Sequence, residues 1–418
     1  MINIKDKSLF GYDSRVILLG VARMADAFGN SFLIVVLPLY IASKGVEGDA
    51  MGLSKTFITG IILGLFGLIT SIAQPFTGRL SDKVGKRKLF VVIGLALFTV
   101  ANYSYSIADS YILLLIIRTA QGIAAAFTIT ASLALITELS NKGNRGKNTG
   151  IYNSFRLVGF GVGPLLSGIL TEGGPYHLPL IGEIDGFTAS FGVASLAALV
   201  SALLVGFFVS DPDNTKPSTK KMKINLLTER KGYFLDPIFA LALATLIMSF
   251  GFSLLAPIET AINEKLSQGA FMFSIQFSAL IAMLAVTQPI IGNASDKYGR
   301  RIFIIIGLIG LIPIILLEGF VTESWQLIVA RALQGISAAM VFAPSLALAG
   351  DLAEEGQRGS QLAVVTMAFG LGISLGSFVS GYAIKFGYAV PFVMAAILSA
   401  IGVFIVKTQV PKKEAEID

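Results

Sequence analysis

The sequence predicts an all-α polytopic membrane protein in which twelve transmembrane helices form two parallel six-helix repeats. Three observations support this fold class. Hydrophobic residues make up 54% of the 418-residue chain and charged residues only 14%, whereas soluble proteins carry about 25% charged residues. Long uncharged stretches recur along the chain, each near or above the roughly 18 apolar residues of a membrane-spanning helix. The second half of the sequence also repeats features of the first half in the same order.

The positions of the basic residues set the expected topology. Placing alternate loops on opposite sides puts 24 of the 32 Lys and Arg residues on the side of both termini, four on the other side and four inside spans. By the positive-inside rule, both termini are therefore cytoplasmic. The predicted spans are approximately 16–41, 55–77, 89–108, 111–138, 149–171, 187–210, 235–260, 270–291, 302–320, 325–350, 360–384 and 388–407.

One long polar connection divides the chain. Residues 211–234 are rich in Pro, Ser and Lys, which is typical of a solvated linker. We therefore predict an N-terminal six-helix bundle (1–210), a cytoplasmic linker (211–234) and a C-terminal six-helix bundle (235–418). Because six spans is an even number, the two bundles cross the membrane in the same direction. Matching positions recur at one constant interval, as in Arg118 and Arg331, Gln121 and Gln334, Glu138 and Asp351, and Gly159 and Gly372.

The composition excludes several kinds of function. The chain has no cysteine, which excludes disulfides and thiolate metal sites, and its one histidine, His177, excludes a site that needs two imidazoles. We expect no metal, no cofactor and no enzyme activity, since no catalytic cluster is present. The net charge of +6 lies in loops, where it sets topology, so we expect no nucleic-acid partner. The polar start of the chain predicts no cleavable signal peptide.

A basic turn occurs twice, once between spans two and three and again between spans eight and nine. Each copy has a glycine at its tight turn, an acid and several bases that favour the cytoplasmic side. Acids at the cytoplasmic ends of spans four and ten can meet these turns, and their symmetry favours a gate over a proton site. The residues expected to form this cytoplasmic gate are Gly78, Asp82, Gly85, Lys86, Glu138, Asp296, Arg300 and Asp351.

A polar stripe on the first span is the strongest candidate site. Arg23, Asp26 and Asn30 are spaced so that they share one helix face. Asp26 lies about 15 Å along the span, where a charge costs roughly 2.5–3.5 kcal/mol, so it is expected to face a cavity or a partner. A purely structural pair between Arg23 and Asp26 is the alternative.

Arg118 on the fourth span is the expected partner of Asp26 from another helix. An opposite charge close by keeps a carboxylate ionised, and moving the arginine away favours the protonated form. This pair would act as a proton switch, and the alternative is a structural buried ion pair. Arg156 on the fifth span is expected to extend toward the cytoplasmic headgroups. Glu259 and Glu318 fall at the outer ends of their spans and are expected to be interfacial.

Glycines on the fifth span predict close helix packing. Gly159, Gly163 and Gly168 recur at short intervals and allow another helix to approach, and Pro164 introduces a kink. Generic packing of membrane helices uses the same residue types, and this alternative remains open.

These motifs together resemble those of the major facilitator superfamily, and in particular its twelve-span drug:proton antiporters. The turn Gly78–Lys88 is similar to the superfamily's loop signature, and Arg118, Gln121 and Gly122 are similar to its fourth-span signature. The fifth span, with Gly150, Gly159, Gly163-Pro164 and Ser167-Gly168, is similar to the antiporter signature, with one serine in place of a glycine.

The resemblance implies a central cavity and rocking of the two bundles between inward-open and outward-open states. It also implies that Arg118 helps proton coupling and that the gate residues hold one state closed. The residues expected to line the substrate cavity are Arg23, Asn30, Gln121, Arg331 and Gln334.

The sequence as a whole predicts a secondary active transporter of the plasma membrane. We expect proton-coupled export of small apolar or cationic compounds by a monomer embedded in the lipid bilayer, with Asp26 and Arg118 in proton coupling. The alternative is a proton-coupled symporter that imports a sugar, an organic acid or a similar nutrient. A membrane sensor or an intramembrane enzyme ranks below both.

Overall fold

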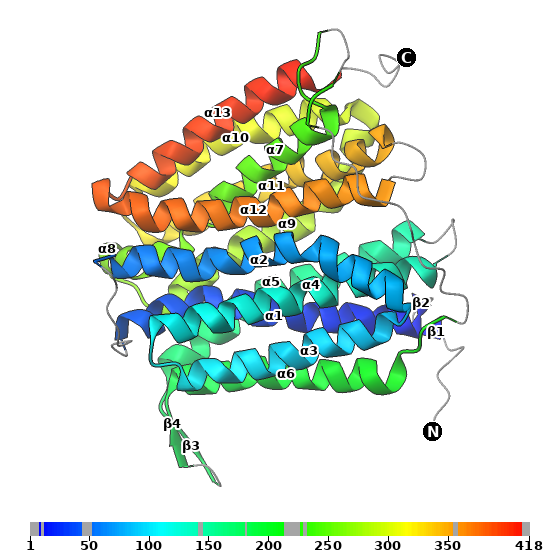
Figure 1. Ribbon diagram of the computed structural model, residues 1–418. Helices are drawn as coiled ribbons and strands as arrows, with labels where there is room; N and C mark the ends of the chain where they lie inside the picture. The colour runs from blue at the N-terminus through cyan, green and yellow to red at the C-terminus, as the bar shows by residue number, and fades with distance from the viewer. Residues whose placement is uncertain are drawn as a thin grey trace. The chain divides into compact units, whose positions relative to one another are not determined.

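The computed structural model describes residues 8–9, 12–43, 52–140, 145–179, 182–212, 226–228, 232–353 and 358–411. Within these residues the chain is almost wholly helical (Figure 1). The α-helices are α1 (Ser14–Ser43), α2 (Lys55–Val84), α3 (Arg87–Ser104), α4 (Tyr111–Glu138), α5 (Arg145–Gly173), α6 (Gly186–Phe208), α7 (Pro237–Phe252), α8 (Glu259–Lys265), α9 (Ala270–Tyr298), α10 (Arg300–Phe320), α11 (Ser324–Leu352), α12 (Arg358–Ala383) and α13 (Val390–Gln409).

Twelve helical segments in the described residues are long and apolar enough to cross a membrane, as predicted. Three of these spans join an α-helix to a 3-10 turn. The turn η1 (Tyr105–Ile107) extends α3, and η3 (Ile384–Phe386) extends α12. The seventh span runs through α7, η2 (Ala256–Ile258) and α8. The apolar length of each stretch therefore predicted the number of spans.

Local sequence signals fix where several helices begin. The Ser110 hydroxyl accepts a hydrogen bond from the Leu113 amide at the start of α4, and the Asp185 carboxylate accepts one from the Thr188 amide at the start of α6. Asp236 caps α7, whose first residue is a proline. Gly85 and Gly299 have φ angles of +70° and +101° in the turns before α3 and α10, a conformation that glycine adopts without steric cost.

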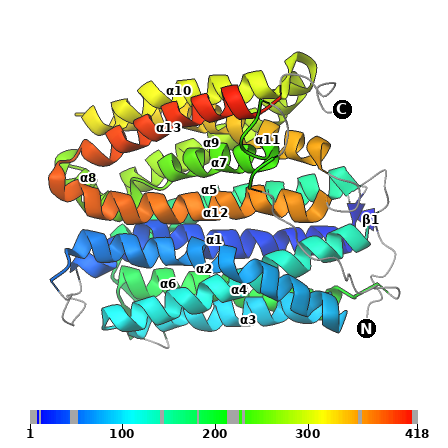
Figure 2. The same ribbon diagram turned by 45° about the horizontal axis from the view of Figure 1, so that its top comes forward.

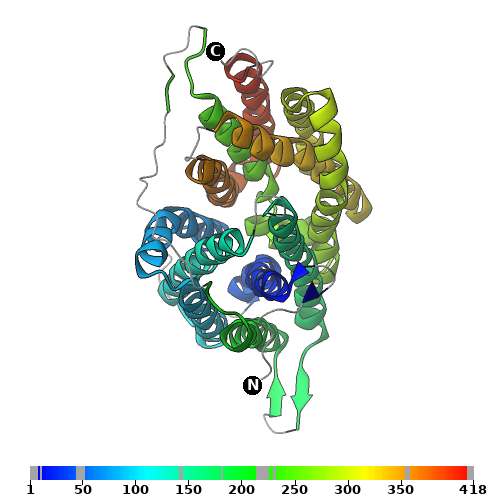
Figure 3. The same cartoon turned by 90° about the vertical axis from the view of Figure 1, so that its right-hand side faces the viewer.

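Two short hairpins accompany the helices. The hairpin of β1 (Ser8–Leu9) and β2 (Tyr12–Asp13) precedes α1. The hairpin of β3 (Tyr176–Leu178) and β4 (Gly182–Ile184) projects from the ends of α5 and α6 (Figures 1 and 3).

The helices pack into two compact units. Unit 1 contains α1, α2 from Ile69 onward, α3 to α6, and α9 as far as Ser278. Unit 2 contains α2 as far as Leu68, α7, α8, α9 from Ala279 onward, and α10 to α13. The unit boundaries therefore divide α2 and α9, whereas the boundaries predicted at residues 210 and 235 leave both helices whole.

Contacts of the divided helices explain this grouping. In unit 2, a Cβ on Gly60 of α2 would lie only 2.5 Å from the carbonyl oxygen of Ser377 on α12. In unit 1, the amide of Phe271 at the start of α9 donates to the Glu172 carboxylate at the end of α5, at 2.9 Å. The Ser278 hydroxyl donates to the carbonyl oxygen of Gly161 at 2.8 Å. Glycines and short polar residues thus bring these segments into close contact.

Within unit 1, α1 packs against α5 through two of the glycines singled out in the sequence. A Cβ on Gly159 would lie 2.3 Å from the Met24 carbonyl oxygen, and one on Gly163 would lie 2.3 Å from the Ser31 hydroxyl. The other helices α3, α4 and α6 run alongside (Figure 2). Residues that are buried between these helices include Leu19, Phe90, Leu95, Leu135 and Val205.

Unit 2 repeats the same helix contact at matching positions. A Cβ on Gly372 of α12 would lie 2.2 Å from the Leu246 carbonyl oxygen of α7, and one on Gly376 would lie 2.3 Å from the Ser253 hydroxyl. Gly372 and Gly376 follow Gly159 and Gly163 at the interval of the internal repeat. The sequence repeat is therefore also a repeat of helix packing.

Candidate functional site

Asp26 lies inside unit 1 and is almost completely buried, with 1% of its surface exposed. Its carboxylate pairs with the Arg23 guanidinium, one helical turn earlier on α1. The charge of Arg156 on α5 also acts on Asp26. The phenol of Tyr152 is buried in the same place, where it interacts with the charges of all three groups. Two arginine charges thus act on one acidic group, which leaves a positive excess.

Arg118 forms a different network in the same unit. Its guanidinium donates to the Asn30 side chain at 3.1 Å and to the Gln121 side chain at 2.9 Å. Gln121 also accepts from the Tyr105 hydroxyl at 2.9 Å and donates to Asn102 at 2.5 Å. The pairing of Asp26 with Arg118, predicted from the sequence, is replaced by the pairing of Asp26 with Arg23. Arg118 instead reaches α1 at Asn30, one turn beyond Asp26.

Unit 2 contains the matching arginine and glutamine on α11. Arg331 donates to the Gln334 side chain at 2.5 Å and to the Phe252 carbonyl oxygen at 3.3 Å. Gln334 donates to the carbonyl oxygen of Gly251 at 3.1 Å. An oxygen of Glu318 lies 3.8 Å from Arg331, and both side chains are fully buried. The predicted cavity residues Gln121, Arg331 and Gln334 are thus held by hydrogen bonds inside their units.

The prediction for two glutamates was wrong. Glu259 and Glu318 were expected at the membrane interface, but neither has any exposed surface. Each glutamate does lie near the end of its span, but its side chain points into unit 2. Arg156 is partly exposed, and its charge acts on Arg23, Asp26 and Tyr152 in unit 1. Its extension toward the headgroups stays a prediction.

Ion pairs join three helix ends in each unit. In unit 1, Arg87 at the start of α3 lies 2.6 Å from Asp82 on α2 and 3.1 Å from Glu138 on α4. We call these three residues the Arg87 cluster. Lys86, which the sequence assigned to this position, is exposed. Because α3 begins at Arg87 rather than at Lys86, it is the Arg87 side chain that faces the two acids.

The second set, which we call the Arg300 cluster, follows the prediction more closely. Arg300 is the first residue of α10 and lies 2.8 Å from Asp296 on α9. It also pairs with Asp351 on α11. Each cluster lies within one unit, and both bridging arginines open a helix.

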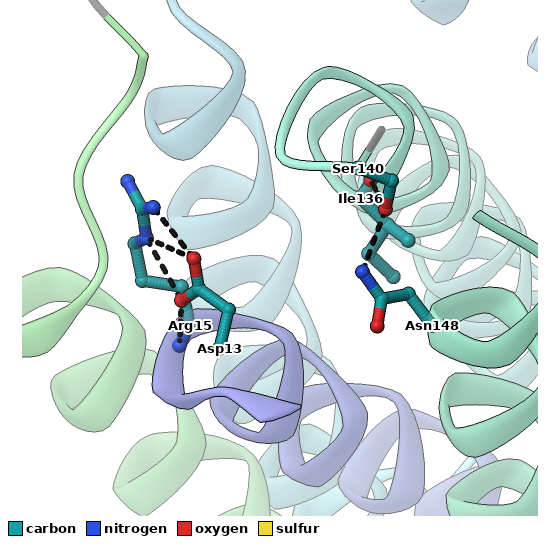
Figure 4. A network of polar contacts seen from close by, with 5 residues as sticks. All are labelled: Asp13, Arg15, Ile136, Ser140 and Asn148. Carbon is teal, nitrogen blue, oxygen red and sulfur yellow. Dashed lines mark hydrogen bonds and ion pairs between the residues drawn. The ribbon is translucent and has the colours of Figure 1, made fainter. Parts of the chain in front are cut away.

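Two further groups of polar contacts lie at the start of α1 and between the end of α4 and the first turns of α5 (Figure 4). Asp13 accepts hydrogen bonds from the Arg15 amide at 2.8 Å and from the Arg15 guanidinium at 2.6 Å. Burial acts to raise the pKa of Asp13, but these hydrogen bonds and the Arg15 charge outweigh it and leave that pKa lowered. Nearby, Asn148 of α5 donates to the Ser140 hydroxyl at 2.8 Å. These contacts stabilise the start of α1 and connect α5 to Ser140, just beyond the end of α4.

The remaining fifth-span residues contact α1 and α9. Gly159 and Gly163 face α1, while Gly168 faces the start of α9, where a Cβ would lie 2.6 Å from the Ser274 hydroxyl. Pro164 lies inside α5. Gly150 has open space around it, with nothing within 4 Å of a Cβ. In the described residues no three His, Asp or Glu side chains form a group that could hold a metal ion.

Comparison with known proteins agrees with this repeat architecture. The family model described as Major Facilitator Superfamily matches residues 19–275 and 241–417, which together cover nearly the whole chain. The chain belongs to the Major Facilitator Superfamily. This multi-pass membrane protein is therefore a transporter, and its helices form the fold of that superfamily.

Two relatives in this superfamily are similar in sequence. An uncharacterized MFS-type transporter of Methanocaldococcus jannaschii is 28% identical over 298 residues, which cover 71% of this chain and 72% of the relative. The quinolone resistance protein NorA of Staphylococcus aureus is 30% identical over 227 residues, which cover 54% of this chain and 52% of NorA. The chain thus matches about half the length of NorA.

Solved structures of the superfamily are similar in fold. A bacterial homolog of the human lysosomal transporter Spinster, in an inward-facing and occupied conformation, has a TM-score of 0.76 at 14% identity, with 94% of this chain and 95% of that chain covered. The human organic anion transporter MFSD10 has a TM-score of 0.67 at 18% identity, with 94% and 98% covered.

Proposed function

We propose that this transporter exports small apolar or cationic compounds in exchange for protons. The likeness to a relative named as a quinolone resistance protein supports export of drug-like molecules. The buried Asp26, which pairs with Arg23 and is acted on by the charge of Arg156, supports proton exchange, since an ionisable group inside a membrane segment is functional by default. This carboxylate is the single observation on which the coupling proposal depends.

The surroundings of Asp26 suggest how a proton acts. The ionised carboxylate offsets the charge of Arg23, whereas protonation increases the positive excess of Arg23 and Arg156. Like charges in a medium of low dielectric repel strongly, so protonation favours a rearrangement of α1 against α5. The positive excess also favours apolar compounds over multiply charged cations within the proposed substrate class.

Arg118 has an indirect role in this proposal. It holds Asn30, one turn beyond Asp26, and so connects α1 to α4 and to Gln121. Movement of α1 after protonation would strain these hydrogen bonds. We therefore propose Arg118 as a group that couples Asp26 to α4 and not as the ion partner of Asp26.

The Arg87 and Arg300 clusters are proposed to serve the gate. Each cluster holds the ends of three helices together inside one unit, so each unit can move as one body during alternating access. The excess of basic residues in the same loops supports a cytoplasmic position for these ends and for both termini. We propose that the transporter acts as a monomer of the plasma membrane.

The test is proton movement during transport in reconstituted vesicles. The purified protein is placed in liposomes that contain a pH-sensitive dye, and a lipophilic fluorescent compound is added under an imposed pH gradient. Exchange predicts that protons and compound cross in opposite directions. Movement of both in the same direction would indicate a symporter that imports its substrate, and proton flux that ignores the compound would contradict coupling.

A further inference from the structure

Glu318 is the counterpart of Tyr105 in the internal repeat. It follows Tyr105 at the same interval that separates Arg118 from Arg331 and Gln121 from Gln334. In unit 1 the Tyr105 hydroxyl donates to the Gln121 side chain beside Arg118. In unit 2 a carboxyl group takes the place of this phenol. The two units therefore share an arginine and a glutamine but differ in the third group.

The Glu318 carboxylate is poorly satisfied when ionised. Neither of its oxygens has a hydrogen-bond partner among the described residues. One oxygen lies 3.8 Å from Arg331, whose guanidinium donates to Gln334 at 2.5 Å and to the Phe252 carbonyl oxygen at 3.3 Å. A buried ion pair offsets its desolvation cost only when further hydrogen bonds complete it. A carboxylate in this setting is therefore not explained as a structural ion pair.

The internal repeat suggests a partner for the protonated form. In unit 1 the O–H group of Tyr105 donates to the side-chain oxygen of Gln121. A carboxylic acid at Glu318 also carries an O–H group, and the matching acceptor is the side-chain oxygen of Gln334. Protonated Glu318 can thus reproduce the contact of unit 1, while ionised Glu318 has the charge of Arg331 nearby.

A tyrosine whose hydroxyl is buried lies near Glu318. Tyr388, in the turn before α13, interacts electrostatically with Glu318 and is partly exposed. Burial, followed by the negative charge of Glu318, raises the pKa of Tyr388, so this phenol keeps its proton. The Lys265 ammonium lies 3.8 Å from the centre of the Tyr388 ring. The Glu318 carboxylate thus interacts with the charge of Arg331 and with Tyr388, and Lys265 contacts Tyr388.

We propose that Glu318 is a second proton-binding group of this transporter, ionised beside Arg331 in one state and hydrogen-bonded to Gln334 when protonated. The proton adds to a carboxylate oxygen and comes from the solution. This inference rests on the proposed proton exchange for its use in transport, but the binding of the proton itself can be measured separately. It places one proton site in each unit, Asp26 in unit 1 and Glu318 in unit 2.

Infrared spectroscopy of the full-length protein in lipid tests the inference. Carbon-13 labelling of all glutamates shifts the bands of their protonated carboxyl groups away from those of aspartates, so Asp26 does not contribute. We expect a buried glutamic acid band that disappears as the pH rises from mildly acidic to alkaline. Glu259 is the other fully buried glutamate of the described residues, so the experiment is run beside Glu259→Gln, which identifies its share of the band. Glu318→Gln should remove the remaining share, whereas Glu264→Gln, at an exposed glutamate of α8, should leave the band unchanged.

A second variant and a transport measurement distinguish a misfolded variant from a wrong inference. Glu318→Tyr supplies the side chain that unit 1 uses and replaces the glutamine variant if that variant does not fold. A full band in either variant, or no titrating glutamic acid band in the wild-type protein, would overturn the inference. In vesicles, Glu318→Gln should lower the number of protons exchanged per substrate. If Asp26→Asn still couples transport to protons while Glu318 titrates, the proposal for Asp26 fails and this one stands.

Discussion

Asp26 is paired with Arg23, one turn earlier on the same helix, and both side chains lie inside unit 1. This pair has a consequence for coupling. An ion pair within one helix does not by itself connect two helices. Protonation of Asp26 can therefore affect another helix only through other contacts of α1. Asn30, held by Arg118, and the glycine contact with α5 are the contacts that the structure provides.

Replacing Arg87 tests the cluster at the helix ends of unit 1. Arg87→Met leaves the Asp82 and Glu138 carboxylates facing each other without a base. We expect a loss of about 1–3 kcal/mol in stability, since an unpaired, partly buried charge costs this much. Transport should fall as well, because α2, α3 and α4 are no longer held together. Thermal unfolding in detergent and vesicle transport measure the two effects.

The adjacent base provides the matched control for this experiment. Lys86 is exposed and precedes Arg87 directly, so Lys86→Met removes the same charge from the same turn. We expect its stability to stay within about 0.5 kcal/mol of the wild type. Equal effects of the two variants would show that only the net charge of the loop matters, as in a topology signal.

The glycine contact between α1 and α5 makes a second prediction. Gly159→Ala places a methyl group 2.3 Å from the Met24 carbonyl oxygen, and the backbone must shift to relieve the overlap. We expect a loss of about 1–3 kcal/mol, measured as a lower unfolding temperature in detergent. Gly372→Ala should have a similar effect in unit 2, because its Cβ would meet the Leu246 carbonyl oxygen at 2.2 Å.

Gly150→Ala is the control on the same helix. Nothing lies within 4 Å of a Cβ at this position, and alanine favours the helix over glycine by about 1 kcal/mol. This variant should be as stable as the wild type or more so. A loss at Gly150 equal to that at Gly159 would refute the close-contact explanation.

The absence of cysteine from the sequence makes the topology prediction easy to test. Single cysteines are introduced at Glu183, in the β3–β4 hairpin, and at Lys83, beside the Arg87 cluster; both side chains are exposed. A membrane-impermeant maleimide should label the Glu183→Cys variant in intact cells and the Lys83→Cys variant only after permeabilisation. The reverse pattern would place the termini outside.

Much of the fold was predictable because it depends on length and order along the chain. Apolar stretches long enough to span a membrane predicted the helices, and the constant interval between matching positions predicted the repeat. The division of α2 and α9 between units was not predictable. It depends on which glycines meet which neighbours, as Gly60 meets Ser377, and spacing within one helix carries no information about the other helix.

The candidate site could also be predicted only in part from the sequence. Spacing placed Arg23, Asp26 and Asn30 on one face of α1, but only the structure shows that Asp26 pairs with Arg23 while Asn30 pairs with Arg118. Depth along the helix suggested an interfacial Glu318, whereas the rotation of α10 buries it. Tyr105 was missed altogether, although its place opposite Glu318 in the internal repeat was a signal in the sequence.

The most direct test of the central claim is proton-driven export by the Asp26→Asn variant in proteoliposomes. Asparagine keeps the size of the side chain but cannot bind the proton, and Asp109→Asn, at an exposed aspartate, is the matched control. We predict that an imposed pH gradient no longer drives export in the Asp26 variant, while the Asp109 variant matches the wild type. Full proton-driven export by Asp26→Asn would contradict the account.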